Sequence, residues 1–215
     1  MLVFTGHEFA EGGNFIAQTL KQQRIKASFF FTGDFYRNKQ FSPVIKLLKQ
    51  QGNYLGAHSD KHLLYCDWSK RDSLLVTKQQ FSFDLGDNYA AMAMHKITGH
   101  HSPFFLPPYE WYNDSIAAWT KKLNLQLINY TPGTLSHADY TGEKDKNFRS
   151  SETIFESVIN YEKSKSSGLN GFILLMHIGA GPGRADKFYN KLPQLINYLK
   201  AKGYSFKRID EMLAK

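Results

Sequence analysis

Short apolar runs alternate with segments in which apolar residues recur every three or four positions along this chain of 215 residues. The short runs have the length and aromatic content of buried strands, and the wider spacing is typical of helices that cover a core. The pattern predicts seven strands, at 2–5, 27–32, 54–57, 104–106, 125–129, 172–176 and 204–209. Helices are expected between most of them, at 14–23, 43–51, 77–95, 113–122, 151–165 and 188–202, with a break near Gly86.

Regular alternation of strands and helices is typical of an α/β fold in which a parallel sheet is covered by helices. Seven such units in a chain of this length favour a small or incomplete β/α barrel over an open sheet, although both architectures match the pattern. We find no internal repeat and no Pro/Gly-rich boundary, so residues 1–215 are predicted to form a single domain. In either architecture, a functional site is expected at the carboxyl ends of the strands.

Two histidines four residues apart follow the third predicted strand, in the stretch His58-Ser59-Asp60-Lys61-His62. If a helix or tight turn begins at Ser59, a good N-cap residue, then positions i and i+4 lie on one face and both imidazoles can point at one ion. Neutral imidazole nitrogen is a preferred ligand of zinc-like divalent ions. The alternative interpretation is a pair of surface or capping histidines.

Polar and titratable residues also follow other predicted strands. These segments are Thr5-Gly6-His7-Glu8, Pro107-Pro108-Tyr109-Glu110-Trp111, Thr131-Pro132-Gly133-Thr134 with Asp139 beyond it, and His177-Ile178-Gly179. Because the carboxyl ends of parallel strands meet at one edge of a sheet, we expect these segments to converge on the histidine pair.

The composition narrows the function classes. The formal net charge is +8, but Lys and Arg are spread along the chain, which indicates a solvated basic surface; attraction to an anionic polymer is the alternative. No nucleic-acid-binding motif is present, and no apolar run approaches the length of a membrane span. Cys66 is the single cysteine, which excludes an internal disulfide.

Met1 directly precedes the strand-like run Leu2-Val3-Phe4. We therefore expect that a leader or an upstream domain has been removed from the natural protein, and that the protein is exported to the periplasm or the cell surface. A cytoplasmic location is the alternative.

The motifs in this order resemble those of the polysaccharide deacetylase family, the NodB-homology group of carbohydrate esterases, over almost the whole chain from Val3 to Ile209. The histidine stretch resembles the family's H-S/T-x-x-H metal motif. The other matches are Phe29-Phe30-Phe31-Thr32-Gly33 after the first motif, Leu106-Pro107-Pro108-Tyr109 for the R-x-P-Y type motif, and Leu174-Leu175-Met176-His177 for the final leucine-histidine motif. The resemblance implies the family's distorted (β/α)7 barrel.

Two positions depart from the family pattern. Where the family usually has T-F-D-D at strand one, with the first Asp as base and the second as metal ligand, this chain has His7 and Glu8. His7 can act as the base, because imidazole titrates near neutral pH, or as a third imidazole ligand. Leu106 occupies the position of the family's arginine in the third motif. Our hypothesis is that Arg184 supplies the missing positive charge and contacts the substrate.

The resemblance implies a metal-dependent hydrolase that removes acetyl groups from an N-acetyl amino sugar or an O-acetylated glycan. Glu8, His58 and His62 are the implied ligands of a divalent ion, with Zn²⁺ favoured over Ni²⁺ or Co²⁺, and the ion activates water and polarises the acetyl carbonyl. His7 is the implied base that takes the proton of the water.

His177 is the implied acid that protonates the leaving amine or alcohol, and Asp139 is expected to hold it. The backbone N–H of Tyr109 is the implied oxyanion donor. Tyr109 and Trp111, with Trp68 and Tyr112, either form a sugar-stacking surface or pack in the core.

Two other functions compete with deacetylation. The substituted first motif motivates a catalytically silent carbohydrate-binding relative that uses the same cleft. The basic charge motivates a polymer-binding protein without a metal.

Overall fold

The computed structural model describes residues 1–213. Six parallel strands form one sheet in the order β5-β4-β3-β2-β1-β6. The strands are β1 (Leu2–Gly6), β2 (Ser28–Phe31), β3 (Tyr54–Ala57), β4 (Phe104–Phe105), β5 (Gln126–Leu127) and β6 (Leu174–His177). Each of them overlaps one of the first six strands predicted from the sequence.

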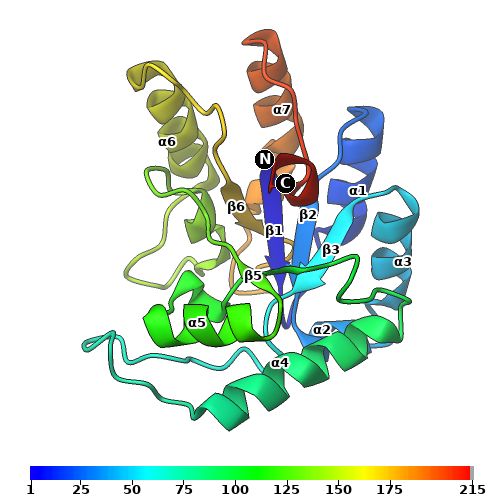
Figure 1. Cartoon of the computed structure of the whole chain (residues 1–215). Helices are drawn as coiled ribbons and strands as arrows, with labels where there is room; N and C mark the ends of the chain where they lie inside the picture. Colours follow the sequence, from blue (N-terminus) through cyan, green and yellow to red (C-terminus); the bar gives the residue numbers. More distant parts are fainter. Residues whose placement is uncertain (214–215) are drawn as a thin grey trace.

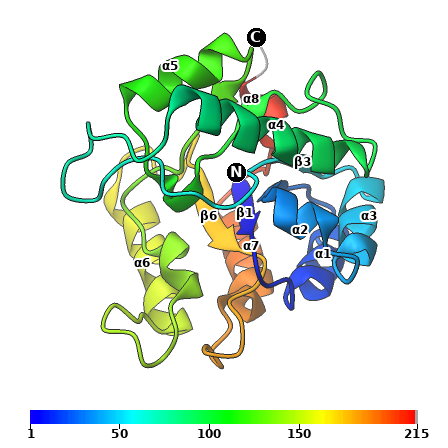
Figure 2. The same cartoon turned by 90° about the horizontal axis from the view of Figure 1, so that it is seen from below.

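Helices surround this sheet and lie across one end of it (Figures 1 and 2). Those around the sheet are α1 (Gly13–Gln22), α3 (Ser42–Gln50), α6 (Ser151–Ser164) and α7 (Leu192–Ala201). Those near the carboxyl ends of the strands are α2 (Gly33–Arg37), α4 (Lys78–Ala93) and α5 (Asp114–Lys122). Short helical turns complete the fold: η1 (Pro108–Glu110), η2 (Ser136–Tyr140), η3 (Phe188–Lys191) and α8 (Ile209–Leu213). None of the helices within residues 1–213 has the length and apolarity to cross a membrane.

The two edges of the sheet meet at a single pair of residues. Thr131, beyond the end of β5, donates its backbone N–H to the carbonyl oxygen of Ile173 at 3.1 Å. The Thr131 hydroxyl in turn accepts from the backbone N–H of Ile173 at 3.0 Å. Because Ile173 directly precedes β6, this pair joins the edge strands and curls the sheet into a distorted barrel, which confirms the predicted fold class.

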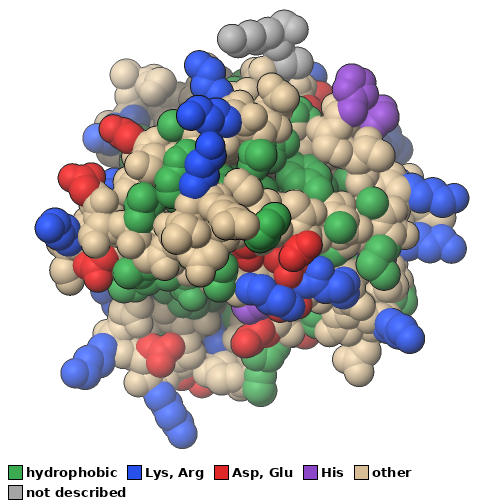
Figure 3. Space-filling model, turned by 60° about the horizontal axis from the view of Figure 1, so that its bottom comes forward, with side chains coloured by type: hydrophobic (Ala, Val, Ile, Leu, Met, Phe, Trp, Pro, Cys, Tyr) green, Lys and Arg blue, Asp and Glu red, His purple; other side chains and the backbone are tan. Residues whose placement is uncertain are grey.

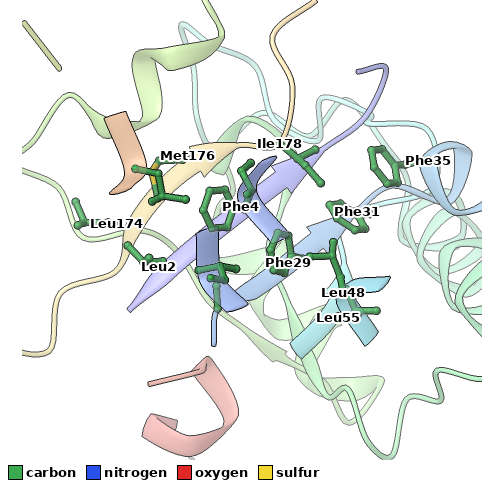
Figure 4. Packing of buried hydrophobic residues seen from close by; sticks show 14 of the residues in the cluster. Leu2, Phe4, Phe29, Phe31, Phe35, Leu48, Leu55, Leu174, Met176 and Ile178 are labelled. Carbon is green, nitrogen blue, oxygen red and sulfur yellow. The ribbon is translucent and has the colours of Figure 1, made fainter. Parts of the chain in front are cut away.

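Successive side chains of each strand point to opposite faces, so the strands build two separate apolar clusters. The outer cluster packs beneath the helices and includes Leu2, Phe4, Phe29, Phe31, Leu55, Leu174 and Met176 (Figure 4). The inner cluster fills the barrel and includes Val3, Phe30, Tyr54, Phe104, Leu106, Ile128 and Leu175. Because the interior is filled with side chains, a binding site has room only at the ends of the strands.

The predicted seventh strand, 204–209, was wrong. Residues 204–208 have no regular secondary structure, and α8 begins at Ile209. Ile209 is fully buried in the inner cluster, and its backbone N–H donates to the hydroxyl of Ser28 at 2.9 Å. Tyr204 and Phe206 instead pack against the outer cluster. The apolar residues of this segment are thus buried because it crosses the amino-terminal end of the barrel and closes it, without pairing with a strand.

The predicted break in the helix near Gly86 was also wrong. Helix α4 is continuous through this position, because Gly86 is exposed and the helix needs no side chain there. Its start is fixed by a capping box in which Thr77 and Gln80 bond to each other's backbone N–H groups. A glycine in an exposed helix position costs about 1 kcal/mol of helix propensity, which packing of the opposite face outweighs.

We expect the change Ile209→Ala to lower the free energy of unfolding by about 2–5 kcal/mol, because it empties the space that Ile209 fills at the end of the barrel. Urea denaturation followed by circular dichroism measures the change. Met212→Ala is the matched control, since Met212 lies in the same helix and is 43% exposed. Equal stability of the two variants would contradict the assignment of α8 as the cover of the barrel.

Candidate active site

A pocket of about 610 Å³ opens at the carboxyl ends of the strands. Its wall is formed by segments that follow five of the six strands: Gly6, His7, Glu8 and Phe9; His62 and Trp68; Tyr109, Glu110 and Trp111; Tyr130, His137 and Tyr140; His177, Gly179 and Ala180. The predicted convergence is therefore confirmed for the segments that follow β1, β3, β4 and β6, whereas residues 131–134 after β5 do not line the pocket. Figure 3 shows the molecule turned so that this end comes forward.

The histidine pair lies in an irregular loop after β3, so no helix begins at Ser59 as the spacing suggested. Ser59 and His62 have φ angles of 71° and 55°, in the left-handed region that residues other than glycine rarely adopt. This backbone brings the ring centroids of His58 and His62 to 5.0 Å from each other. The two imidazoles thus meet as predicted, but through a loop that tertiary contacts must hold in place.

Asp84 of α4 holds this loop from one side. Its carboxylate accepts hydrogen bonds from the hydroxyl groups of Ser59 at 2.7 Å and Tyr65 at 2.9 Å. It also accepts from the backbone N–H groups of Asp60 at 3.2 Å and Lys61 at 3.0 Å. Asp84 is only 7% exposed, and hydrogen bonds to a charged group are stronger where water is excluded.

Asn88 and the start of α2 hold the same loop from two other sides. Asn88 lies one turn after Asp84 in α4, and its side-chain oxygen accepts from the backbone N–H of His58 at 2.9 Å. The backbone N–H groups of Gly33 and Asp34 donate to two carbonyl oxygens of the loop at 3.1 and 3.2 Å. A Cβ atom at Gly33 would lie 1.7 Å from a carboxylate oxygen of Asp60, so this close approach requires glycine.

The buried imidazole of His58 has a defined tautomer. Its Nδ1 lies 2.8 Å from the backbone carbonyl oxygen of Leu106. Because a carbonyl oxygen can only accept, Nδ1 carries the hydrogen and Nε2 keeps its lone pair. Burial lowers the pKa of His58 to about 3, although the bond to Leu106 opposes the shift. A neutral imidazole whose other nitrogen is held by a carbonyl group is the usual form of a metal-binding histidine.

His62 and His7 add two imidazoles beside His58. The rings of His7 and His62 stack with their centroids 4.9 Å apart and an angle of 11° between their planes. Burial lowers the pKa of His62 to about 2, and the neighbouring histidines add to this effect. His7 is further oriented by the Thr32 hydroxyl, 3.1 Å from its Nδ1. His7 therefore lies beside the histidine pair, and its roles as base or third imidazole ligand stay predictions.

Glu8 lines the same pocket with an exposed side chain. Among residues 1–213, no group of three or more His, Cys, Asp or Glu side chains is arranged as a metal site, so the structure assembles two of the three predicted ligands and leaves Glu8 at the wall. Two neutral imidazoles and a nearby carboxylate are nevertheless the donor types that a zinc-like ion takes. The residues present therefore fit a divalent ion in their chemistry.

His177 and Asp139 form a second unit of the pocket. His177 ends β6, and its Nδ1 lies 2.7 Å from one carboxylate oxygen of Asp139. The other oxygen of Asp139 accepts from the backbone N–H of His177 at 2.9 Å. Burial opposes protonation of His177, but the negative charges of Asp139 and Glu110 outweigh it and raise the pKa of His177 above its ordinary value. The predicted contact between Asp139 and His177 is present.

Glu110 lines the pocket although no role was predicted for it. It lies in η1 after Tyr109, and both residues have positive φ angles, of 54° and 57°. Burial raises the pKa of Glu110 to about 7; the charge of His177 opposes the shift and that of Asp139 adds to it. Its position directly after a predicted strand-end motif was a local signal of a functional role. His137, Tyr130 and Tyr140 also line the pocket, and no comparable signal marked them.

Aromatic side chains form one wall of the pocket. Trp68 is 55% exposed, and its ring lies 5.6 Å from Trp111 and 5.5 Å from Tyr109 between centroids. Tyr109 contacts His62 edge-on at 4.4 Å, which connects the aromatic wall to the histidine pair. Trp111 and Tyr112 both pack against the outer core cluster, but of these two only Trp111 also lines the pocket. The structure thus places Tyr109 and Trp111, the predicted substrate-binding residues, in one accessible surface with Trp68.

Arg184 does not reach the pocket, so its predicted contact with substrate was wrong. Its side chain is fully buried. Its Nε donates to the carbonyl oxygen of Asp186 at 2.6 Å, Nη1 to that of Thr141 at 3.0 Å and Nη2 to that of Arg149 at 2.9 Å. A buried guanidinium persists only where its N–H groups are paired, and here backbone carbonyls from three places pair them. Arg184 thus joins the loop after β6 to the segment before α6.

Comparison with known proteins places these features in a family. The model of the family described as polysaccharide deacetylase matches residues 11–128, which is more than half of the chain. YheN of Bacillus subtilis (strain 168), named as a provisional polysaccharide deacetylase, is 27% identical over 198 residues, which cover 92% of this chain and 62% of that protein.

Two further relatives are named for their substrates. The peptidoglycan-N-acetylglucosamine deacetylase of Bacillus cereus is 22% identical over 92% of this chain and 62% of its own length. The peptidoglycan-N-acetylmuramic acid deacetylase PdaA of Bacillus subtilis is 24% identical over 92% of this chain and 65% of its own length. This chain therefore spans less than two thirds of these relatives.

Solved structures share the fold. The Bc1960 peptidoglycan N-acetylglucosamine deacetylase superimposes with a TM-score of 0.75 at 21% identity, covering 98% of this chain and 86% of that one. BA3943 of Bacillus anthracis, described as a pseudoenzyme of carbohydrate esterase family 4, has a TM-score of 0.70 at 19% identity, over 99% of this chain and 65% of that one. The family match, the histidine loop and the shared fold agree, and this chain belongs to the polysaccharide deacetylase family.

Proposed function

We propose that this protein is a metal-dependent deacetylase that hydrolyses acetyl groups of a glycan. The observation that carries the proposal is the arrangement of one pocket, in which His62, the Asp139-bound His177 and an aromatic wall meet, with the buried His58 in ring contact with His62. Two relatives named as peptidoglycan deacetylases support the reaction class. An acetylated glycan of the cell envelope is then the matching substrate, acted on in the periplasm or at the cell surface.

Glu8, His58 and His62 would hold the divalent ion, with Zn²⁺ preferred over Ni²⁺ or Co²⁺. When bound, such an ion supplies polarisation of the acetyl carbonyl and a water of lowered pKa. The proposal is supported by the hydrogen on Nδ1 of His58, which leaves Nε2 free for coordination.

His7 takes the proton of the attacking water in this proposal. The Thr32 hydroxyl lies 3.1 Å from Nδ1 of His7, and the proposal requires the tautomer in which Nδ1 donates to this hydroxyl and Nε2 receives the proton. The same hydroxyl accepts from the backbone N–H of Phe35 as the cap of α2, so it is itself held in place. The base thus has an orienting partner although this chain lacks the family's arginine at Leu106.

His177 gives a proton to the leaving amine or alcohol. Asp139 occupies its Nδ1, so the proton leaves from Nε2 on the pocket side. The raised pKa of His177 keeps the imidazolium populated closer to neutral pH. The backbone N–H of Tyr109 is the proposed donor to the oxyanion.

A catalytically silent carbohydrate-binding protein is the second candidate function. Two observations favour it: the first motif contains His7 and Glu8 in place of two aspartates, and no three metal ligands are assembled within the described part of the chain. The family fold also occurs in BA3943, which is described as a pseudoenzyme. Protein that binds oligosaccharide and never releases acetate would decide for this candidate.

Chelation of metal and the change His58→Ala are each expected to abolish acetate release from acetylated oligosaccharides, because both remove the polarisation of the carbonyl. Acetate is measured by a coupled enzymatic assay, and Zn²⁺ should restore the chelated protein. His100→Ala is the control, since His100 is an exposed histidine away from the pocket. Activity that survives both treatments would exclude the metal-dependent mechanism.

Asp139→Asn is expected to lower kcat by about 10²–10⁴-fold and to move the alkaline limb of its pH profile to lower pH. Asp139 raises the pKa of His177, so a neutral amide lets the imidazolium lose its proton at lower pH. The measurement is kcat from pH 5 to 9, with the exposed Asp72→Asn as control. An alkaline limb that stays in place would show that His177 is not the acid.

Asp84→Asn is expected to weaken binding of Zn²⁺ or Co²⁺ by about 10–100-fold, because an amide cannot accept all four hydrogen bonds that hold the histidine loop. Calorimetric titration of Zn²⁺ and the visible spectrum of Co²⁺ measure the effect. Asp87→Asn, an exposed change in the same helix, serves for comparison. Unchanged metal affinity would mean that the loop needs no support from α4.

A further inference from the structure

Among the described residues, the pocket wall contains acidic side chains but no Lys or Arg. Glu8 and Glu110 contribute carboxylates, and no Lys or Arg of residues 1–213 lines the pocket. This contrasts with the net charge of +8 for the whole chain. In Figure 3 the Lys and Arg side chains are scattered over this side of the molecule, and several stand next to acidic side chains. The basic charge of the protein is thus placed outside its pocket.

The cations nearest to the wall segments are held by other groups. Arg71 stacks on Trp111 with its guanidinium carbon 4.3 Å from the ring centroid. The ammonium of Lys187 lies 2.6 Å from a carboxylate oxygen of Glu11. Arg184 is buried among backbone carbonyls, as described above. None of these three side chains contributes to the pocket wall, and the imidazole of His177, which does, is already paired with the carboxylate of Asp139. A negative charge on a bound sugar would therefore find no Lys or Arg partner there among the described residues.

Glu110 is the acidic residue placed to exclude such a charge. It is half-buried in the wall, next to the aromatic residues Tyr109 and Trp111 that would contact a sugar. The buried carboxylate of Asp139 adds negative potential in the same region. Two like charges brought together in a poorly hydrated pocket repel strongly, because little water screens them.

We propose that Glu110 determines sugar specificity by restricting the pocket to acetylated sugars without an acidic substituent. The class accepted is a neutral N-acetylhexosamine; sugars that carry a free carboxylate, such as a lactyl ether or a uronic acid, are rejected. This inference rests on the proposed function and deepens it by naming the sugar class. It also separates two relatives, since one is named for N-acetylglucosamine and the other for N-acetylmuramic acid.

Binding is the test, because it needs no catalysis. Metal-free protein is titrated by tryptophan fluorescence from Trp68 and Trp111 with two tetrasaccharides at pH 8.5. One contains N-acetylglucosamine alone, and the other alternates it with N-acetylmuramic acid that carries no peptide. Since burial raises the pKa of Glu110 to about 7, its side chain is ionised at this pH. We expect the neutral tetrasaccharide to bind at least about tenfold more tightly.

The variants assign this preference to one charge. Glu110→Gln should bring the two affinities to within about threefold by strengthening binding of the acidic tetrasaccharide, whereas Glu110→Asp should keep the preference. Glu156→Gln, an exposed change in α6, is the control and should behave as the wild type. A Gln variant that keeps the full preference would overturn the role of Glu110.

The outcomes also separate this inference from the proposed function. Equal affinity of wild-type protein for both tetrasaccharides overturns the specificity alone. Preference for the neutral tetrasaccharide, without acetate release from metal-loaded protein, upholds the specificity and overturns the deacetylase. Failure of the metal-free protein to bind either tetrasaccharide overturns the specificity, and acetate release from metal-loaded protein then decides separately on the deacetylase.

Discussion

The site depends on the hydrogen bonds that the loop carrying the histidine pair donates to the buried carboxylate of Asp84. The loop that carries His58 and His62 has left-handed backbone at Ser59 and His62, which costs free energy that local sequence does not recover. Four hydrogen bonds to Asp84 hold that backbone, and Asn88 and the first N–H groups of α2 bond to the same loop. The histidine pair is therefore positioned by a helix that begins 16 residues after it.

The contacts of Leu106 and His7 show what these two residues do at positions where the family has other residues. Leu106 replaces an arginine, and its side chain fills the barrel interior while its carbonyl oxygen fixes the tautomer of His58. His7 replaces an aspartate base, and the hydroxyl of Thr32 orients it where the family would use the arginine. Within residues 1–213, the pocket wall also contains no Lys or Arg side chain beside Glu110. The substitutions thus bear on the proposed chemistry, and the charges of the wall bear on the proposed specificity.

Two buried charged groups near the pocket, Arg184 and Asp139, differ in the partners that satisfy their hydrogen bonds. Arg184 donates to three backbone carbonyls and to the hydroxyl of Ser151, which makes it a support for loops. Asp139 instead gives one oxygen to the Nδ1 and the other to the backbone N–H of His177, so its charge acts on an imidazole that faces the pocket. Both arrangements satisfy the rule that buried charge must be paired. The chemistry of the partner decides which of them bears on function.

The sequence by itself determined the α/β class, the first six strands and the strand-end segments that meet in the pocket, because periodicity and strand direction are local properties that fix which side chains share an edge. It could not determine the structure of residues 204–209, since the apolar residues Tyr204, Phe206 and Ile209 predict a strand although they belong to two clusters. Nor could it place Arg184 in the interior or Glu110 on the pocket wall. Only the tertiary structure decided these points, because pairing and exclusion of charge depend on groups brought together from distant parts of the chain.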